Sequence, residues 1–410
     1  MKLGLITQWF APEEFLLPNS VSEESVKAGF DVRVLTGFPS YPAGVIYDGY
    51  HQAVGFREVI MGADVYRVKS FLSHDANALK RILTFGSFAL SSTLRADVMA
   101  DVDVIYVYAT PMTAAIAGWW LSKRYGIPYV LHIQDLWPES VTSSGMLTKG
   151  VVTSVAGSVI SALLKPLYSS AAHIIVISPS MKSALVSRGV QASKITTVFN
   201  WELHSIEGPS RGRRSMGKSG IRFVYAGNLG VMQDVETILR AAELLVDKPE
   251  IEFHIYGSGV QESSLHLLAA NAGLSNVTFH GRVTKREMSD VYATADFLLV
   301  TLKDDPLFRM TIPSKFQAAM AHGIPVVSTV QGDLERICTD AGVGWTAAPE
   351  DPSSLAEALM KAAASAPSHR SAMTERCRAL YKDKFSLDKG VAAVRSILTD
   401  VTVTKGKGIC

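Results

Sequence analysis

A charged loop that leads into a helix is the segment of this sequence best suited to chemistry. The apolar run Phe297–Val300 predicts a buried strand, and a polar loop containing Arg309 follows it. Ser314, in the position of an N-cap, and Lys315 then open a helical stretch that ends at Gly323. Free N–H groups at a helix start attract anions, and Lys315 adds a full charge. This pattern fits a phosphate site and an ordinary solvated loop equally well.

Short turns after three other predicted strands of the second half could also approach a phosphate. They contain Gly227, Asn228, Gly230, Gly257, Arg282 and Val283. Glycine lets the backbone come close to a phosphate group, and Arg282 could pair with one. The backbone beside Arg282 could also read a nucleobase. Each turn, taken alone, fits a simple surface or strand-to-helix turn as well.

A second polar cluster follows a predicted strand in the first half of the chain. Asp135, Trp137 and Glu139 come directly after the apolar run 129–133. Asp135 is a candidate to orient or activate a hydroxyl group, because a carboxylate can accept its proton. His132 alternates toward the core, which favours a buried, hydrogen-bonded histidine over a ligand.

Alternating apolar runs and helical patterns position these residues. The runs are 3–6, 32–35, 59–68, 104–108, 129–133, 174–177 and 195–199, then 222–226, 252–256, 277–280, 297–300, 325–328 and 343–346. This alternation predicts an α/β protein with two doubly wound, Rossmann-like domains, and the region 45–67 also fits a β-hairpin. Ligands of such sheets bind beyond the carboxyl ends of the strands, so a cleft between the domains is expected.

Changes in composition set the expected domain boundaries. Residues 1–206 form the first domain, and residues 207–220, rich in Gly, Ser and Arg, form a linker or a basic surface loop. Residues 221–385 form the second domain. Residues 386–410 are expected to form a C-terminal helix, packed back on the first domain, and a tail.

Length and composition agree with a globular protein of two domains. The chain has 410 residues, 48% of them hydrophobic and 19% charged, with net charge +2, which argues against a disordered or nucleic-acid-coating protein. Three widely spaced cysteines, Cys338, Cys377 and Cys410, indicate a reducing compartment without a disulfide framework. The start lacks a signal-peptide pattern, and no apolar run reaches the roughly 20 residues of a membrane span. We expect a cytoplasmic protein.

The ordered set of motifs resembles family 4 glycosyltransferases of the GT-B fold. It is most similar to the bacterial subgroup that builds surface polysaccharides, including colanic acid transferases and fucosamine transferases of O-antigen and capsule clusters. The resemblance covers nearly the whole chain. It is carried by the segments 35–44 (LTGFPSYPAG), 135–140 (DLWPES), 177–182 (ISPSMK), 198–201 (VFNW), 225–230 (YAGNLG), 313–315 (PSK) and 320–326 (MAHGIPV).

The resemblance implies a retaining sugar transfer from a nucleotide-sugar donor, with UDP as the default nucleotide and no metal or other cofactor. The second domain would bind an amino or deoxyamino sugar nucleotide. Pro313, Ser314 and Lys315 would lie at its diphosphate. The first domain would bind a lipid-diphosphate-linked saccharide. Its acceptor side would comprise Pro12, Glu13, Asp135, Trp137 and Glu139.

The resemblance also bears on two segments of the first half. The segment from Lys80 to Leu90 is basic and then apolar, which fits a membrane-surface helix or a core helix. The implied lipid-linked acceptor favours a membrane contact at the inner face. Asp101 and Asp103 spell the D-x-D of metal-dependent sugar transferases, but they precede a strand. A site would follow the strand, so metal binding is disfavoured.

The sequence departs from the family pattern where charges are expected. The family's two glutamates would fall at Met310 and Ala318, and its Arg–Lys pair at Asn228 and Gln233. The cations that remain for the diphosphate are Lys315, Arg309 and Arg282. These losses keep open a non-catalytic partner subunit. A nucleotide-sugar epimerase, which would need no acceptor, is a second alternative, but the several carboxylates and histidines that such enzymes use in the cleft are not found in the sequence.

Overall fold

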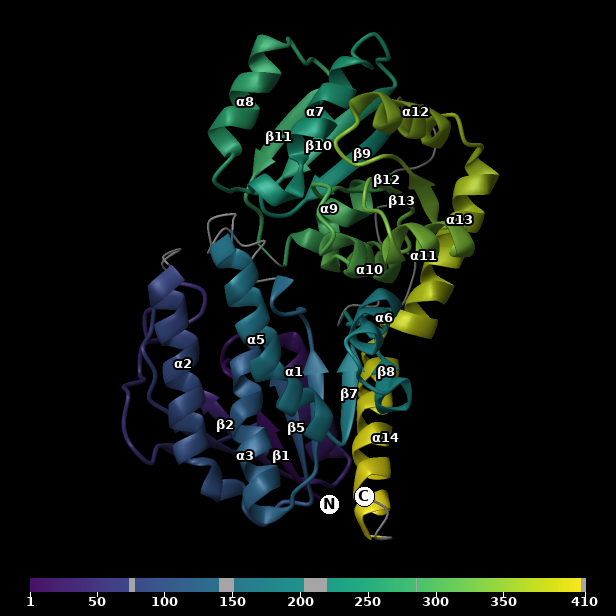
Figure 1. Ribbon diagram of the computed structural model, residues 1–410. Helices are drawn as coiled ribbons and strands as arrows, with labels where there is room; N and C mark the ends of the chain where they lie inside the picture. The colour runs from purple at the N-terminus through teal and green to yellow at the C-terminus, as the bar shows by residue number, and fades with distance from the viewer. Residues whose placement is uncertain (74–77, 140–150, 203–219, 285, 407–410) are drawn as a thin grey trace. The chain divides into compact units, whose positions relative to one another are not determined.

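The protein forms two compact units in a computed structural model that describes residues 1–73, 78–139, 151–202, 220–284 and 286–406 (Figure 1). The first unit contains residues 1–199 and the segment from residue 390 onward. The second unit contains residues 200–389. The predicted linker 207–220 lies outside the described residues except for Gly220.

The first unit is built on an eight-stranded sheet. Its strands are β1 (Lys2–Ile6), β2 (Asp31–Gly37), β3 (Arg57–Ile60), β4 (Ala63–Val68), β5 (Val104–Ala109), β6 (Tyr129–Ile133), β7 (His173–Val176) and β8 (Ile195–Thr197). They lie in the order β3-β4-β2-β1-β5-β6-β7-β8, all parallel except the antiparallel pair β3–β4. Every residue of β5 and β6 is buried, as their continuous apolar runs predict for strands covered on both faces.

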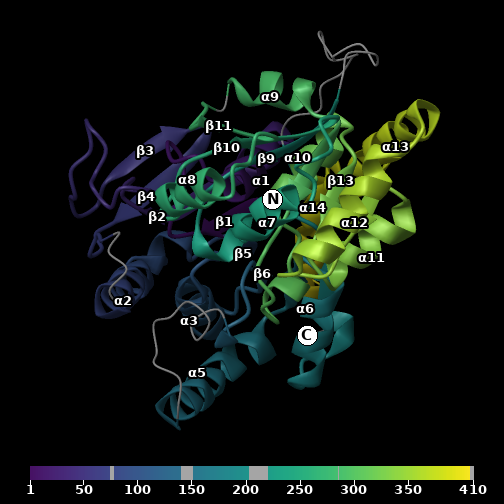
Figure 2. The ribbon, with the colours of Figure 1, turned by 90° about the horizontal axis from the view of Figure 1, so that it is seen from above.

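Helices pack on this sheet in two groups. The helices are α1 (Leu16–Lys27), α2 (Ala78–Leu94), α3 (Ala115–Tyr125), α5 (Val151–Ser170), α6 (Pro179–Ser187) and the later part of α14 (Leu387–Gly406). α2, α3 and α5 lie side by side in one layer (Figures 1 and 2). α1 packs on β2 and β4, and Arg395 of α14 donates to the Glu24 carbonyl of α1 at 3.2 Å. This bond ties the end of the chain to its beginning.

The second unit is built on a six-stranded parallel sheet. Its strands are β9 (Ile221–Ala226), β10 (Ile251–Tyr256), β11 (Val277–Gly281), β12 (Phe297–Val300), β13 (Val326–Ser328) and β14 (Gly344–Thr346). They lie in the order β11-β10-β9-β12-β13-β14. The rings of Phe253 and Phe297 stack on Phe223 from either side, with centroids 5.8 and 5.3 Å away. These rings form the centre of the core.

Seven α-helices of the described chain cover this second sheet. They are α7 (Val235–Glu243), α8 (Glu262–Asn271), α9 (Met288–Thr294), α10 (Ser314–His322), α11 (Asp333–Ala341), α12 (Pro352–Ala363) and α13 (Pro367–Leu380). α7, α8 and α12 contribute apolar side chains to the core around the stacked phenylalanines. A π-helical turn, Tyr381–Phe385, connects α13 to α14.

The two predicted doubly wound sheets are confirmed. The predicted strands match within two residues at either end, except that the run 59–68 folds as the hairpin β3–β4 instead of one strand. The apolar run continues through the turn at Met61 and Gly62, where both residues have positive φ. Cys338 and Cys377 are buried free thiols. None of the helices in the described ranges is long and apolar enough to cross a membrane.

Candidate functional site

Lys315 lies at the start of α10, directly after Pro313 and Ser314. Its Nζ donates to the hydroxyl oxygen of Tyr225 at 2.7 Å and lies 4.1 Å from the centre of that ring. The Tyr225 hydroxyl donates in turn to the Asn228 carbonyl at 2.7 Å, which leaves its oxygen able to accept from the ammonium. The lysine is therefore held beside the turn that follows β9.

The surroundings of Lys315 favour a bound anion. Burial lowers the pKa of Lys315 to about 8, because the ammonium loses hydration. The observed partners of the ammonium are a neutral hydroxyl group and an aromatic ring. Neither is a carboxylate that would raise the pKa of Lys315 again. A phosphate oxygen at Nζ would favour the charged form and would receive a charge-assisted hydrogen bond.

Two glycines make room for this lysine and join neighbouring turns. A Cβ at Gly227 (φ +155°) would lie 2.2 Å from Cε of Lys315, and a Cβ at Gly257 (φ +143°) would lie 1.8 Å from the Gly227 carbonyl oxygen. The Gly227 N–H donates to the Tyr256 carbonyl at 2.9 Å, and the Gly257 N–H donates to the Gly281 carbonyl at 2.7 Å. The turns after β9, β10 and β11 are thus packed too closely for side chains at these positions.

The structure brings the predicted donor-side residues to one edge of the second sheet, with unequal exposure. Gly230 is buried, Pro313, Gly227, Gly257 and Val283 are half-buried, and Asn228, Ser314 and Arg282 are exposed. Arg282 makes no hydrogen bond or ion pair with the described residues. It follows the edge strand β11, and β10 separates β11 from β9.

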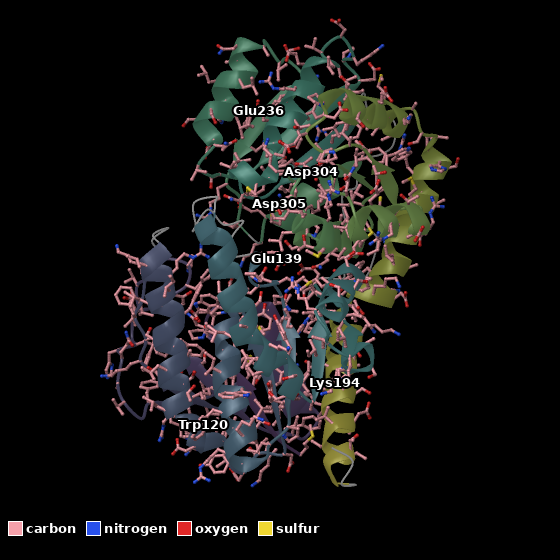
Figure 3. The ribbon with its side chains drawn as sticks, viewed as in Figure 1. Trp120, Glu139, Lys194, Glu236, Asp304 and Asp305 are labelled. Carbon is pink, nitrogen blue, oxygen red and sulfur yellow. The ribbon has the colours of Figure 1, made fainter. Side chains whose placement is uncertain are left out.

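Arg309 is already paired with a carboxylate. Its Nε and Nη2 donate to Oδ1 of Asp304 at 3.1 and 2.8 Å, and Nη2 also reaches Oδ2 at 3.0 Å. Both residues lie in the loop after β12, where Figure 3 labels Asp304. The predicted contact of Arg309 with a phosphate therefore requires this ion pair to open.

The predicted N-cap role of Ser314 is wrong. α10 begins at Ser314, the cap position belongs to Pro313, and no side chain caps the helix. Pro313 has the extended backbone of a cap residue (ψ 140°) but no side-chain acceptor. The Phe316 N–H donates to the Pro313 carbonyl at 2.9 Å, which leaves the N–H groups of Ser314 and Lys315 for another acceptor. Gly323 ends the helix in the left-handed conformation, as predicted.

Asp135 follows β6 and is half-buried. Burial raises the pKa of its carboxyl group, and the described residues offer it no hydrogen bond. Such a carboxylate is suited to accept a proton from a hydroxyl group. His132 is fully buried, with Nδ1 2.6 Å from the Tyr106 hydroxyl and Nε2 3.0 Å from Nε2 of Gln134. It is the predicted core histidine.

Glu13 holds two loops together by hydrogen bonds to their backbone. This role corrects the prediction that Glu13 contacts an acceptor. It is 1% exposed, and its carboxylate accepts the N–H groups of Phe10 at 3.2 Å and of Ser40 and Tyr41 at 2.8 Å each. The loops after β1 and β2 are joined through these bonds. Burial raises the pKa of Glu13. Pro12 beside it is exposed.

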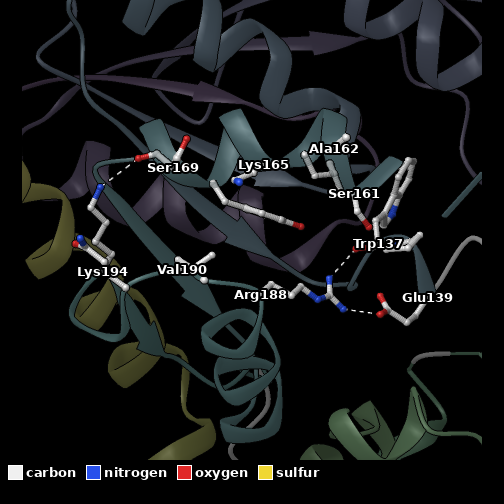
Figure 4. Close-up of a pocket in the computed structure, with 14 residues that line it drawn as sticks. Trp137, Glu139, Ser161, Ala162, Lys165, Ser169, Arg188, Val190 and Lys194 are labelled. Atoms are coloured by element: carbon white, nitrogen blue, oxygen red, sulfur yellow. Dashed lines mark hydrogen bonds and ion pairs between the residues drawn. The ribbon is translucent and has the colours of Figure 1, made fainter. Parts of the chain in front are cut away.

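Trp137 and Glu139 line a pocket of the first unit. The Glu139 carboxylate pairs with Arg188 at 2.5 Å, and Arg188 also donates to the Trp137 carbonyl at 2.8 Å (Figure 4). The pocket has a volume of about 520 Å³. The two residues predicted for the acceptor side therefore share a concave surface.

The D-x-D motif takes part in ion pairs before β5. Asp101 pairs with Lys2 at 2.7 Å and with Arg33, and the Asp103 carboxylate accepts the Lys2 N–H at 2.7 Å. These bonds hold the pKa of Asp101 well below its usual range. The motif joins the amino ends of neighbouring strands, as its place before a strand predicts.

Tyr225 is the site residue that sequence reasoning missed. It lies within the apolar run of β9, where a tyrosine has the pattern of an ordinary core residue. The signal that could have found it is its place two residues before Gly227, at the carboxyl end of a strand.

Two family models match successive parts of the chain. "Glycosyl transferase 4-like domain" matches residues 19–201, and "Glycosyl transferases group 1" matches residues 220–365. The chain is a group 1, family 4 glycosyltransferase. The first model falls in the first unit, and the second falls in the unit that holds Lys315.

Relatives of this glycosyltransferase include one protein provisionally assigned to colanic acid biosynthesis. WbjE of Pseudomonas aeruginosa, provisionally named as a glycosyltransferase, is 26% identical over 73% of the chain and 76% of its own length. WcaI of Escherichia coli K12 is provisionally named as a colanic acid biosynthesis glycosyl transferase. It is 27% identical over 82% of the chain and 84% of its own length.

Solved structures show that the fold is GT-B. Anabaena HepE, solved in complex with UDP and glucose, has a TM-score of 0.66 and 14% identity, covering 98% of this chain and all of its own. Sucrose-phosphate synthase of Thermosynechococcus elongatus has a TM-score of 0.73 and 16% identity, covering 98% of this chain and 99% of its own. The predicted fold class is thereby confirmed.

Proposed function

We propose that this glycosyltransferase moves a sugar, with retention and without a metal, from a UDP-linked donor to a lipid-diphosphate-linked saccharide. The donor sugar is an N-acetylated amino or deoxyamino sugar, and the product enters a surface polysaccharide such as O-antigen, capsule or exopolysaccharide. The likeness to WcaI, provisionally named for colanic acid biosynthesis, supports the pathway class. The UDP complexes of HepE support the nucleotide.

The half-buried Lys315, with its ammonium at the start of α10 beside neutral partners, is the observation that carries this proposal. In the transfer, the bond from the anomeric carbon to the diphosphate breaks and the nucleoside diphosphate leaves with added negative charge. Lys315 and the free N–H groups of α10 would stabilise that charge. In the described residues, no cluster of three or more His, Cys, Asp or Glu side chains could hold a metal for this task.

Asp135 supports the acceptor side of the proposal. Its carboxylate, half-buried and without a partner in the described chain, would orient the attacking hydroxyl group and receive its proton. Arg309 would add a second cation at the diphosphate if its pair with Asp304 opens on donor binding.

The surface of α2 supports a location on the inner face of the cytoplasmic membrane. Its exposed apolar side chains recur at helical spacing on one stripe, Leu79, Ile82, Leu83, Leu90 and Leu94, each more than half exposed. Lys80 and Arg81 lie at the start of the same helix. An apolar stripe with basic residues at one end fits the interface of an anionic bilayer, so the segment from Lys80 to Leu90 is the proposed membrane contact.

The donor is tested by thermal unfolding with UDP, GDP and dTDP and their common sugars, in the presence of a metal chelator. Selective stabilisation by UDP and a UDP-sugar is expected, since a ligand of the native state raises the melting temperature. Stabilisation by another nucleotide would correct the donor, and a requirement for added metal would contradict the metal-independent mechanism. No stabilisation by any of them would favour the non-catalytic partner, which the missing family glutamates also suggest.

A further inference from the structure

A pocket in the first unit is lined by none of the residues proposed to bind the nucleotide. α5, the loop after β6 and the segment between α6 and β8 enclose about 520 Å³ (Figure 4). Its lining includes Trp137, Leu164, Lys165, Tyr168, Arg188 and Lys194. Lys315 and the turns after β9 to β11 all belong to the other unit. The pocket thus needs its own explanation.

Positive charge dominates the lining. Among the lining residues that the structure describes, Lys165, Arg188 and Lys194 are cations and Glu139 is the single carboxylate. Glu139 pairs with Arg188. Lys194 donates to the carbonyl groups of Ser169 at 3.2 Å and Ala171 at 3.4 Å, which are neutral acceptors. Two positive charges are left without a neutralising partner, which suits a dianion.

Two polar groups of the lining have no partner in the described residues. The ammonium of Lys165 makes no hydrogen bond or ion pair there. The Tyr168 hydroxyl is buried without a hydrogen-bond partner, in a residue that is 6% exposed. A buried hydroxyl without an acceptor typically costs about 1–3 kcal/mol, so an acceptor near it would be stabilising. Burial raises the pKa of Tyr168 to about 12, which keeps this hydroxyl a donor at neutral pH.

The pocket adjoins the proposed membrane helix. Trp137 lines it, and the Trp137 ring lies 6.4 Å from the ring of Phe85 on α2. Arg81 lies over the same phenylalanine, 5.9 Å from the ring centre. Leu164 and Val190 add apolar surface to the lining. A ligand with a doubly charged head and an apolar or ring-shaped body matches these walls.

We propose that this pocket binds the phosphate-bearing group of the acceptor, with Lys165 and Lys194 as its charged contacts and Trp137 against the adjoining body. This inference rests on the proposed function and deepens it. It assigns the anionic group of the acceptor to a site built from residues of the first unit. A lipid diphosphate and a soluble sugar phosphate share the chemistry that the pocket would recognise.

The test follows Trp137 directly by ¹⁹F NMR of the full chain labelled with 5-fluorotryptophan. Trp137→Phe assigns the resonance, and saturating UDP occupies the proposed nucleotide site. Inorganic pyrophosphate should then shift the Trp137 signal in a saturable way. Lys165→Gln should weaken this binding at least about tenfold, because a charge-assisted contact is lost. Lys123→Gln, an exposed lysine of α3 outside the pocket lining, should leave it unchanged.

Farnesyl diphosphate separates the two sources of the anion. Tighter binding of farnesyl diphosphate than of pyrophosphate would indicate a lipid diphosphate as the ligand. Equal binding of the two would indicate recognition of the phosphates alone. A Trp137 signal that does not move with either probe at millimolar concentration overturns the inference, as does displacement of pyrophosphate by UDP. Loss of the UDP thermal shift with the Trp137 response intact would instead overturn the donor assignment and leave the pocket standing.

Discussion

At the scale of single residues, the proposed donor site depends on a lysine whose observed partners are neutral. Tyr225 fixes the position of the Lys315 ammonium through its hydroxyl and ring without supplying negative charge. The lysine is therefore preorganised for an anion that arrives from solution, and little rearrangement is needed when charge develops on a leaving diphosphate.

Replacing Lys315 with alanine should lower the turnover number at least a hundredfold. Removing one preorganised charge contact typically raises a barrier by roughly 3–4 kcal/mol, which corresponds to that loss of rate. Steady-state transfer from the UDP-sugar measures the effect. Lys361→Ala, on the exposed face of α12, is the matched control and should behave as the native enzyme. Near-native turnover in a folded Lys315→Ala protein would remove Lys315 from the site.

The affinity for UDP should fall as the pH rises above about 8. The pKa of Lys315 is lowered to about 8 in the free protein, so the site loses its positive charge above that pH. A ligand that binds the charged form then weakens by up to about tenfold per pH unit. Lys315→Arg stays charged and should flatten this dependence between pH 7 and 9. Calorimetric titration over that range is the measurement, and identical profiles for both proteins would contradict it.

Asp135→Asn should lower turnover while leaving UDP binding unchanged. The amide keeps the size of the side chain but cannot accept the proton of the acceptor hydroxyl. General-base catalysis typically contributes about 10²–10⁴-fold, which bounds the expected loss. Transfer rates and UDP titrations of the same preparation separate the two effects. Unchanged transfer, or a parallel loss of UDP affinity, would show that the carboxylate does not act on the acceptor.

At the scale of elements, the order of strands and helices was predictable from apolar runs. β5, β6 and β12 are buried along their full length, so their runs are continuous and bounded by polar residues. The split of residues 59–68 into β3 and β4 was predicted only as one of two possibilities, a single strand or a hairpin, because the two-residue turn interrupts no hydrophobic pattern. The start of α10 was misplaced by one residue, since a serine has the pattern of a cap even where a proline holds that position.

The contacts within the candidate site were predictable only in part. Lys315 stands out as a charge at a predicted helix start, a pattern that fits a solvated loop equally well, and Asp135 stands out as a carboxylate directly after a buried strand. The Glu13 carboxylate was misread because its three N–H donors come from two loops that only the folded sheet brings together. The pairing of Arg309 with Asp304 depends in the same way on the path of one loop.

The apolar stripe on α2 should govern attachment to anionic vesicles. Leu83→Ser with Leu90→Ser should weaken binding at least about tenfold, since burying one leucine is worth roughly 1.5–3 kcal/mol. Cosedimentation with vesicles of phosphatidylglycerol and phosphatidylcholine is the measurement. Leu267→Ser on α8, where the leucine is 62% exposed, is the control and should not weaken binding. Equal binding of the double variant and the native protein would place the membrane contact elsewhere.

At the scale of the whole molecule, the two units differ in how the chain builds them. The first unit needs both ends of the chain, because the segment from residue 390 joins residues 1–199. The second unit is one continuous stretch, residues 200–389, with its own phenylalanine-centred core. The lysine, the glycine turns and α10 all belong to this continuous unit, so the proposed nucleotide site should not depend on the rest of the chain for its assembly.

Residues 200–389, expressed alone, should fold cooperatively and bind UDP within roughly tenfold of the affinity of the full chain. The expectation follows from a self-contained core and from a Lys315–Tyr225 contact made entirely inside the unit. Thermal unfolding with and without UDP is the measurement, and the same fragment with Lys315→Ala is the control that should lose the UDP response. A fragment that melts cooperatively yet ignores UDP would show that the first unit supplies nucleotide contacts. The nucleotide site would then have to be reassigned to both units.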